Sequence, residues 1–257
     1  MTEAGTYLVS YFKPFFQDKF SIIEHIYYAG DDVSAEYRDW AERYDADEVI
    51  VLLSSFDETV IQHDAPFNLG IHQYGENVFS PNGHKYIRQF DCESVPTVTY
   101  RVGGVILTKE KVFISHENRI LIKYTLVEAH SLTTLQFRPF LAFRNANELC
   151  VENNSLNKDM QSVANGLSCC LYPGYPELFM QFNKEAKWVS DGHWYKGIEY
   201  YKDRDRGLPY KEDLWVPGYF ELPIKKGESI IFSASTFVAK PEEFEKTYED
   251  EIATRTT

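Results

Sequence analysis

The chain has 257 residues, a formal net charge of −13 at pH 7, 44% hydrophobic residues and 16% aromatic residues. Nucleic acids and anionic membranes select basic surfaces, so this charge argues against both as partners, and no apolar run approaches the length of a membrane span. Such a length accommodates one large all-β domain or two small ones; since no shift in composition divides the chain, we expect one.

Residues 1–48 form an atypical N-terminal segment, which we assign to the same domain. Its first ten residues contain no basic stretch leading into a long apolar core, which argues against a secretory signal and predicts a cytoplasmic protein. Residues 9–16 and 20–29 are apolar and rich in β-formers, so they pair as strands or form a buried segment. Asp31 and Asp32 then precede apolar residues at helical spacing, which predicts a short helix over residues 33–44.

Residues 49–239 are predicted to form one strand after another. The 18 tyrosines and 18 phenylalanines of the chain favour strands over helices. Residues 97–102 alternate apolar and polar side chains before Gly103 and Gly104, so this strand and the next form a hairpin. Frequent strands with turn signals between them predict an antiparallel sandwich rather than a parallel α/β sheet. The predicted strands cover residues 48–53, 97–102, 105–108, 120–127, 135–138, 161–163, 167–171, 178–182, 186–189, 219–222 and 229–233.

Proline, asparagine and glycine mark the breaks in this pattern. Pro139 indicates an edge strand or a bulge, because proline cannot donate to a β ladder. Residues 145–158 are polar and rich in asparagine, which predicts a loop. The turn-forming residues 225–228 separate the last two predicted strands, and we expect those strands to form a hairpin that closes the domain.

The segment from Trp188 to Glu221 holds three of the four tryptophans among many Tyr, Asp, Glu and Arg residues. Its charges, glycines and prolines predict a series of turns rather than a core element. It is either a long connection folded onto its own small aromatic core, or a surface where rings stack on a sugar and charged groups bond its hydroxyls. The predicted carbohydrate-binding residues are Trp194, Tyr195, Glu199, Tyr200, Arg206, Glu212, Asp213 and Trp215.

Residues 240–257 are predicted to contain a C-terminal helix. Pro241 suits the first turn, acidic residues follow near the helix start, and Phe244, Tyr248 and Ile252 lie on one stripe. The sequence offers this stripe nothing further to pack on. We therefore expect a linker helix that leads into a further domain.

Cysteine usage indicates neither a disulfide framework nor a cofactor site. Cys169 and Cys170 are adjacent, Cys92 and Cys150 lie far apart, and no CxxC pair occurs, so we expect reduced core residues. No histidine lies at ligand spacing from any of them, which leaves a zinc site weakly supported. We expect no metal and no cofactor.

Several motifs resemble the N-terminal domain of bacterial and archaeal glycogen debranching enzymes, and together they cover most of the chain from about residue 49. The first 48 residues depart from the family, whose members open with N-G-x-G-G-Y-type and R-x-Y-H-G-L-L stretches. The matching motifs are L-L-S-S-F-D-E-T-V (52–60), Y-R-V-G-G-V-I-L-T-K-E (100–110), L-Q-F-R-P-F-L-A-F-R (135–144), Y-P-G-Y-P-E-L (172–178) and R-G-L-P-Y-K-E-D-L-W-V-P-G-Y-F-E-L-P (206–223).

This resemblance implies an antiparallel β-supersandwich, of the kind found in galactose mutarotase and ahead of the glucoamylase barrel. In the family an α/α barrel carries the catalytic carboxylates, and we expect residues 240–257 to lead toward such a barrel, which is absent from this chain. The intact protein would be an amylo-α-1,6-glucosidase of glycogen catabolism, with this domain shaping the substrate site and bracing the barrel. Its implied partners are that barrel and an α-glucan, either glycogen or a maltooligosaccharide. Whether the aromatic segment binds glucan or docks on the barrel, its rings should be exposed in this chain.

Two other functions stay open. One is a free-standing α-glucan-binding module; the other is an aldose-epimerase-like enzyme with a histidine as general acid. A stand-alone glycosidase would need two carboxylates across a cleft, and since the sequence gives no through-space distances, we assign no catalytic residue. The carboxylate candidates are Glu199, Asp203, Asp205, Glu212 and Asp213, and the histidine candidates are His63, His72, His84, His116, His130 and His193.

Overall fold

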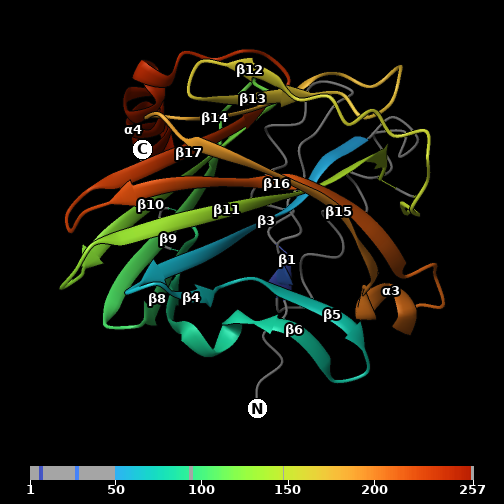
Figure 1. The fold of residues 1–257 in the computed structure, drawn as a ribbon, viewed down its shortest axis with the longest axis horizontal. Coiled ribbons are helices and arrows are strands. Elements are labelled where there is room, and N and C mark those ends of the chain that lie inside the picture. The colour runs from blue at the N-terminus through green and yellow to red at the C-terminus, as the bar shows by residue number, and fades with distance from the viewer. Residues whose placement is uncertain (1–5, 8–26, 29–49, 93–94, 147, 256–257) are drawn as a thin grey trace.

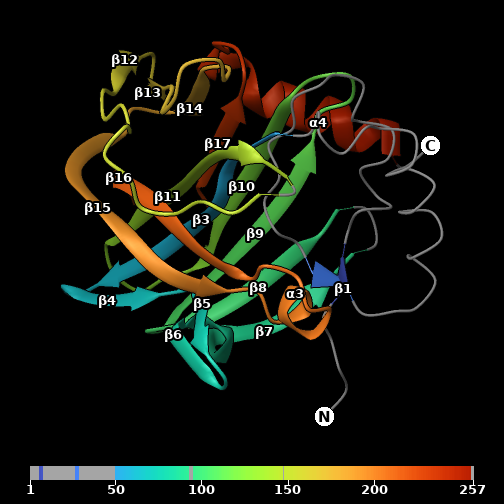
Figure 2. The same cartoon turned by 90° about the vertical axis from the view of Figure 1, so that its right-hand side faces the viewer.

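The computed structural model describes residues 6–7, 27–28, 50–92, 95–146 and 148–255. Two antiparallel sheets lie face to face in Figures 1 and 2, which confirms the predicted all-β antiparallel sandwich. The five-stranded sheet runs from edge to edge through β15 (Lys187–Glu199), β16 (Lys211–Ile224), β11 (Thr133–Asn145), β3 (Ile50–Gln62) and β4 (Ala65–Asn68). The eight-stranded sheet runs through β12 (Gln161–Val163), β13 (Gly166–Cys169), β14 (Leu178–Phe182), β17 (Ser229–Ser235), β10 (Arg119–Glu128), β9 (Val105–Phe113), β8 (Thr97–Val102) and β7 (Ile87–Asp91).

Smaller elements complete the described chain. β5 (Ile71–Gly75) pairs with β6 (Val78–Asn82), and β1 (Thr6–Tyr7) pairs with β2 (Tyr27–Tyr28). The helical elements are η2 (Gly83–Tyr86), α3 (Tyr201–Asp205), η3 (Pro241–Glu243) and α4 (Phe244–Arg255). Apart from β2, the predicted strands within residues 9–29 lie outside the described residues, as does the predicted helix over residues 33–44.

Aromatic side chains from both sheets fill the space between them. Phe56 of β3 stacks on Phe232 of β17 with ring centroids 3.9 Å apart. Phe137 of β11 lies 4.9 Å from Tyr124 of β10 and 5.3 Å from Phe182 of β14. Each such ring pair contributes about 0.5–1.5 kcal/mol beyond its area burial, so the two sheets stabilise each other through one shared core.

β11 contains Pro139, yet it is a central strand between β3 and β16. The β11–β16 register shifts between Phe137 and Leu141, and the β11–β3 register shifts just after Phe140. The ladder to β16 is therefore interrupted at the proline, which has no N–H to donate to a strand. The bulge prediction is confirmed, and the alternative of an edge strand is wrong.

The predicted closing hairpin is also wrong. β16 lies in the five-stranded sheet, whereas β17 lies in the eight-stranded sheet between β14 and β10. Residues 225–228 therefore carry the chain from one layer of the sandwich to the other. The turn itself is regular, since the Lys225 N–H bonds Glu228 Oε2 at 2.9 Å and the Glu228 N–H bonds the Lys225 carbonyl at 2.9 Å.

The predicted C-terminal helix is present as η3 and α4, and it packs on the sandwich. Phe244 and Tyr248 are 0% and 3% exposed and join Val112, Leu121 and Ile231 of the eight-stranded sheet in a second hydrophobic cluster. This stripe covers the face of that sheet opposite the main core. Sequence alone gave the stripe no partner, because the strands that meet it lie far upstream. Its role as a linker stays a prediction.

The aromatic segment forms β15, α3 and β16 rather than a series of turns, so that prediction is wrong. Four of its glycines and prolines lie at positions where the pairing between strands is interrupted. The β15–β16 register shifts between Ser190 and His193 and again between Tyr195 and Ile198, which accommodates Gly192 and Gly197 as bulges. Pro217 and Gly218 lie on the stretch of β16 that the β11 ladder skips. Glycine and proline here mark bulges within one long ribbon of two paired strands, β15 and β16, which we call the aromatic ribbon.

Candidate functional site: the aromatic ribbon and the outer sheet face

The period-two alternation of β15 divides the predicted stacking rings between two faces. Trp194 pairs in register with Trp215, their rings lie 5.7 Å apart, and both pack against the main core. Tyr195, one residue on, lies on the opposite face, 4.8 Å from the ring of Phe140. Trp194, Tyr195 and Trp215 therefore do not form a single stacking platform.

Trp215 is a core residue with 4% exposure, and Tyr200 is 8% exposed, so the expected exposure of these two rings is wrong. A Cβ added at Gly192 would lie 2.8 Å from Cζ2 of Trp215, which makes glycine necessary at that bulge. The Lys158 ammonium lies 5.2 Å from the Trp215 ring centroid. Among the described residues, no acceptor meets the buried Nε1 of Trp215.

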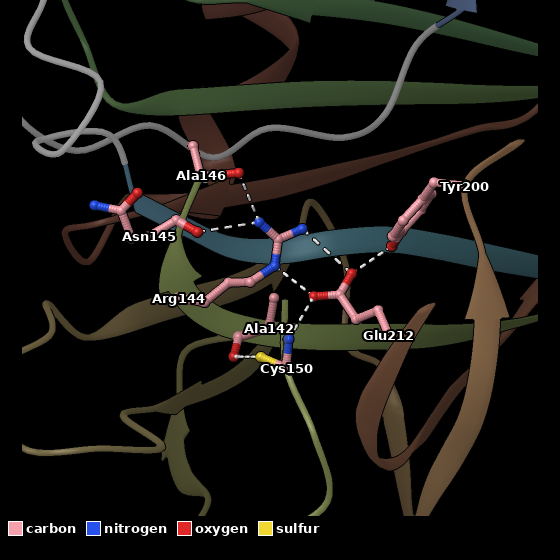
Figure 3. Close-up of polar contacts among 7 residues, drawn as sticks. All are labelled: Ala142, Arg144, Asn145, Ala146, Cys150, Tyr200 and Glu212. Carbon is pink, nitrogen blue, oxygen red and sulfur yellow. Dashed lines mark hydrogen bonds and ion pairs between the residues drawn. The ribbon is translucent and has the colours of Figure 1, made fainter. Parts of the chain in front are cut away.

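A buried ion pair joins the ribbon to β11. Arg144 is 5% exposed at its side chain and Glu212 0%. The Arg144 Nε and Nη2 atoms donate to the two carboxylate oxygens of Glu212, with Nη2 at 3.2 Å. The Tyr200 hydroxyl and the Cys150 backbone N–H also donate to this carboxylate, the latter at 3.1 Å. Figure 3 shows all four donors converging on Glu212.

The remaining guanidinium nitrogen of Arg144 is used locally. Its Nη1 donates to the carbonyls of Asn145 and Ala146 at 3.1 and 3.2 Å, and the Cys150 thiol donates to the Ala142 carbonyl at 2.9 Å (Figure 3). The cluster thus fixes the end of β11, the loop after it and the start of β16. Breaking one side of a buried, hydrogen-bonded pair is costly, because the other charge stays buried, so we assign this cluster a structural role.

The cluster's protonation states follow from its burial. Burial alone would lower the pKa of Arg144, but the adjacent Glu212 carboxylate outweighs it and raises that pKa. Burial, followed by the nearby Glu212 charge, raises the pKa of Tyr200 well above its ordinary value. Burial likewise raises the pKa of the Cys150 thiol to about 12. The phenol and the thiol are therefore protonated at neutral pH, with the thiol unreactive.

Other predicted carbohydrate-binding residues are engaged to different degrees. Glu199 is 8% exposed, and its carboxylate lies 2.9 Å from Lys211 and 3.7 Å from Arg204. Asp213 accepts the backbone N–H groups of Gly197 at 2.8 Å and of residue 152 at 2.9 Å. Arg206 is exposed just after α3. Carbohydrate binding by the eight predicted residues stays a prediction.

Sequence reasoning missed a cluster on the outer face of the five-stranded sheet, the face turned away from the core. His72 of β5 is 8% exposed and bonds Asp57 of β3 through Nε2 at 2.8 Å. Its ring lies 4.5 Å from Phe140, which in turn contacts Tyr195. The ring of His193 lies 4.7 Å from Tyr195, so two candidate histidines flank one aromatic pair.

Polar side chains extend this outer face across three strands. Gln136 of β11 bonds Glu221 of β16 at 3.4 Å, and Lys187 of β15 bonds the same carboxylate at 2.8 Å. In the neighbouring row, the guanidinium of Arg138 lies 4.6 Å from the Tyr219 ring centroid and 3.6 Å from Asp191. Strand alternation within residues 135–138 predicts an outward Arg138, but only the sheet order shows its neighbours.

The other four candidate histidines are exposed and lie in other segments of the chain; they are His63, His84, His116 and His130. The four cysteines are free, and Cys169 is the buried member of the set. Within the described residues, no group of three or more His, Cys, Asp and Glu side chains is placed to hold a metal ion. The described helices include none long and apolar enough to span a membrane.

Comparison with known protein families gives a match over most of the chain. Residues 41–231 match the family described as glycogen debranching enzyme N terminal. The chain belongs to this family. The matched residues include the aromatic ribbon, the Arg144–Glu212 cluster and the named residues of the outer face. A comparison with curated proteins gives no match.

Solved structures similar to this debranching-enzyme domain include polysaccharide-active enzymes. A bacterial glucoamylase in complex with acarbose aligns at a TM-score of 0.43 and 11% identity, over 81% of this chain and 32% of its own. A mutant of heparan sulfate lyase HepC from Pedobacter heparinus aligns at 0.38 and 14%, over 80% and 26%. The chain therefore spans about a third or less of the length of these enzymes.

Proposed function

We propose that this chain is the non-catalytic, substrate-shaping N-terminal domain of a glycogen debranching enzyme. It works in the cytoplasm with a catalytic α/α barrel that hydrolyses the α-1,6 bonds at glycogen branch points. Its substrate-side partner is an α-glucan, and its protein partner is that barrel. Membership of the family supports the proposal, and the positions of the acidic side chains support the absence of a catalytic role.

The engagement of three of the segment's carboxylates, those of Glu199, Glu212 and Asp213, carries the proposal. A glycosidase needs two carboxyl groups facing the scissile bond, one of them able to give or take a proton. Glu212 already accepts four hydrogen bonds within the fold, Asp213 accepts two backbone N–H groups, and Glu199 is paired with two basic side chains. Using any of them for hydrolysis would dismantle contacts that hold the ribbon.

The test measures glucose release from a branched limit dextrin. Three samples are compared: the chain alone, a debranching-enzyme α/α barrel produced as a separate protein, and the two mixed. We expect no release from the chain alone and a higher kcat/KM for the mixture than for the barrel. Release by the chain alone, abolished by Glu199→Gln, would overturn the non-catalytic assignment. An unchanged barrel rate would overturn the substrate-shaping role.

A further inference from the structure

The outer face of the five-stranded sheet combines open charged groups with flat rings. Asp191 and His193 are 54% and 43% exposed at their side chains, and Arg138 is 20% exposed. The guanidinium of Arg138 covers the ring of Tyr219, and His193 lies against Tyr195. In Figure 1 this sheet lies in front of the eight-stranded one, so the face is turned toward the viewer.

Charge on this face is balanced, although the whole chain carries −13. Arg138 is matched by Asp191, and Lys187 by Glu221. A polymer of one charge sign would leave the groups of like sign on this face unmatched. A neutral ligand that both donates and accepts hydrogen bonds can use both signs at once, which is the chemistry of sugar hydroxyls.

The hydrogen-bonding groups retain unused capacity. His193 uses Nδ1 on the Asp191 carbonyl at 2.8 Å, and its Nε2 meets no partner within the described residues. The Arg138–Asp191 contact, at 3.6 Å, is too long for a good hydrogen bond, so both groups can turn to a ligand. When Arg138 turns to a ligand, the face of the Tyr219 ring that it covers becomes available for the C–H side of a sugar. Tyr195 holds the ring of His193 beside this position, 4.7 Å away.

The extent of the face suits a chain of sugars better than a single one. The polar rows cross β11, β16 and β15, and neighbouring strands lie about 4.8 Å apart, so the face is on the order of 10 Å wide. Asp57 and His72 border it on the β3 side, where their mutual bond leaves them less available. An extended oligosaccharide can lie across the strands between Arg138 and His193.

We propose that Arg138, Asp191, His193, Tyr195 and Tyr219 form a binding face for one neutral α-glucan chain on the outside of the five-stranded sheet. This face differs from the predicted set, of which it keeps Tyr195 alone. The proposal rests on the proposed function for the identity of the glucan. The face binds glucan in the isolated domain, before any contact with a barrel.

The test uses the double variant Asp191→Ala/His193→Ala in the full chain. Its matched control, Asp250→Ala/His130→Ala, removes the same residue types at exposed positions outside the face. Binding is measured by native affinity electrophoresis in gels with and without glycogen and by titration with maltoheptaose. We expect affinity to fall at least tenfold in the face variant and to stay within about twofold in the control. Equal urea midpoints check that both variants fold.

The outcomes test the binding face and the proposed function independently. Equal glucan affinity in the face variant and the unmodified chain would overturn the face, as would the absence of any binding by the unmodified chain. If the chain still raises the activity of the barrel in either case, the proposed function stands. If the face binds glucan but the chain leaves the barrel unchanged, the face stands and the protein is a free-standing glucan-binding module.

Discussion

At the scale of single residues, Glu212 should be among the most sensitive positions to substitution. Glu212→Ala removes the only carboxylate bonded to the buried Arg144 guanidinium in the described cluster, together with the acceptor of Tyr200 and of the Cys150 N–H. Leaving one partner of a buried pair uncompensated costs about 3–5 kcal/mol. We expect the free energy of unfolding, measured by urea denaturation, to fall by that amount.

A second acidic residue of the same segment provides the control for Glu212. Asp205, at the end of α3, has a side chain 60% exposed, so Asp205→Ala should change the free energy of unfolding by no more than about 0.5 kcal/mol. If Glu212→Ala cost less than about 1 kcal/mol, the cluster would not be the brace we describe.

Tyr74 should make stability depend on alkaline pH. Burial, followed by the nearby Tyr195 and Asp57, raises the pKa of Tyr74 from 10.0 to about 12. Below pH 10 the phenol is protonated in both the folded and unfolded states, and its contribution to stability is complete. Between pH 10 and about 12 the unfolded chain ionises first, so that contribution is lost as the pH rises.

The Tyr74→Phe variant isolates this effect from the other tyrosines and from Cys150. We expect the difference in free energy of unfolding between variant and unmodified chain to be constant from pH 8 to 10. Above pH 10 it should move in favour of the variant, as followed by urea denaturation at each pH. A difference that stays flat up to pH 12 would show that Tyr74 titrates normally.

At the scale of elements, α4 should contribute to the stability of the sandwich. Phe244 is fully buried against the eight-stranded sheet, and Phe→Ala in such a site typically costs about 3–5 kcal/mol. We therefore expect Phe244→Ala to lower the urea midpoint clearly, while Glu249→Ala, exposed on the same helix, leaves it nearly unchanged. An unaltered midpoint in Phe244→Ala would mean that α4 is only a linker.

Strand prediction succeeded where the pattern is local. β8, β12 and β14 have the predicted bounds, because each is a short run bounded by turn-forming residues that need no distant partner to be recognised. The aromatic segment failed because its glycines and prolines were interpreted as turns, although they occupy bulges that exist only once β11, β15 and β16 are aligned. The false hairpin at 225–228 has the same origin, since a short turn does not reveal that its strands join different sheets.

Only part of the candidate site can be predicted from the sequence, because its contacts also depend on residues that are distant along the chain. The sequence predicts Glu212 and Tyr200 as carbohydrate-binding residues, which requires them to be accessible, as charged residues mostly are. Their burial depends on Arg144, which is 68 positions from Glu212 and is not marked by any local pattern. The outer-face group of Arg138, Asp191 and Tyr219 depends likewise on strand order. The sequence indicates which residues have side chains suited to binding a sugar, but it does not show which of these side chains share a face of the sheet.

At the scale of the whole molecule, the shared core makes the two sheets interdependent. The described tryptophans, Trp188, Trp194 and Trp215, all belong to the five-stranded sheet, while Trp40 lies outside the described residues. Tryptophan fluorescence therefore reports mainly on one layer, whereas far-UV circular dichroism reports on both. Since the rings between the layers come from both sheets, removing one layer would expose the other to water, and neither should persist alone.

We expect unfolding in urea to give coincident midpoints by fluorescence and circular dichroism, as a two-state transition requires. Phe137→Ala, in the centre of the shared core, should lower both midpoints together, with a cost of about 3–5 kcal/mol. A fluorescence transition that precedes the circular dichroism transition would show that the five-stranded sheet unfolds by itself. In that case the outer face could rearrange without loss of the fold. The glucan affinity of a variant would then have to be compared with the free energy of this local opening, rather than with the free energy of global unfolding.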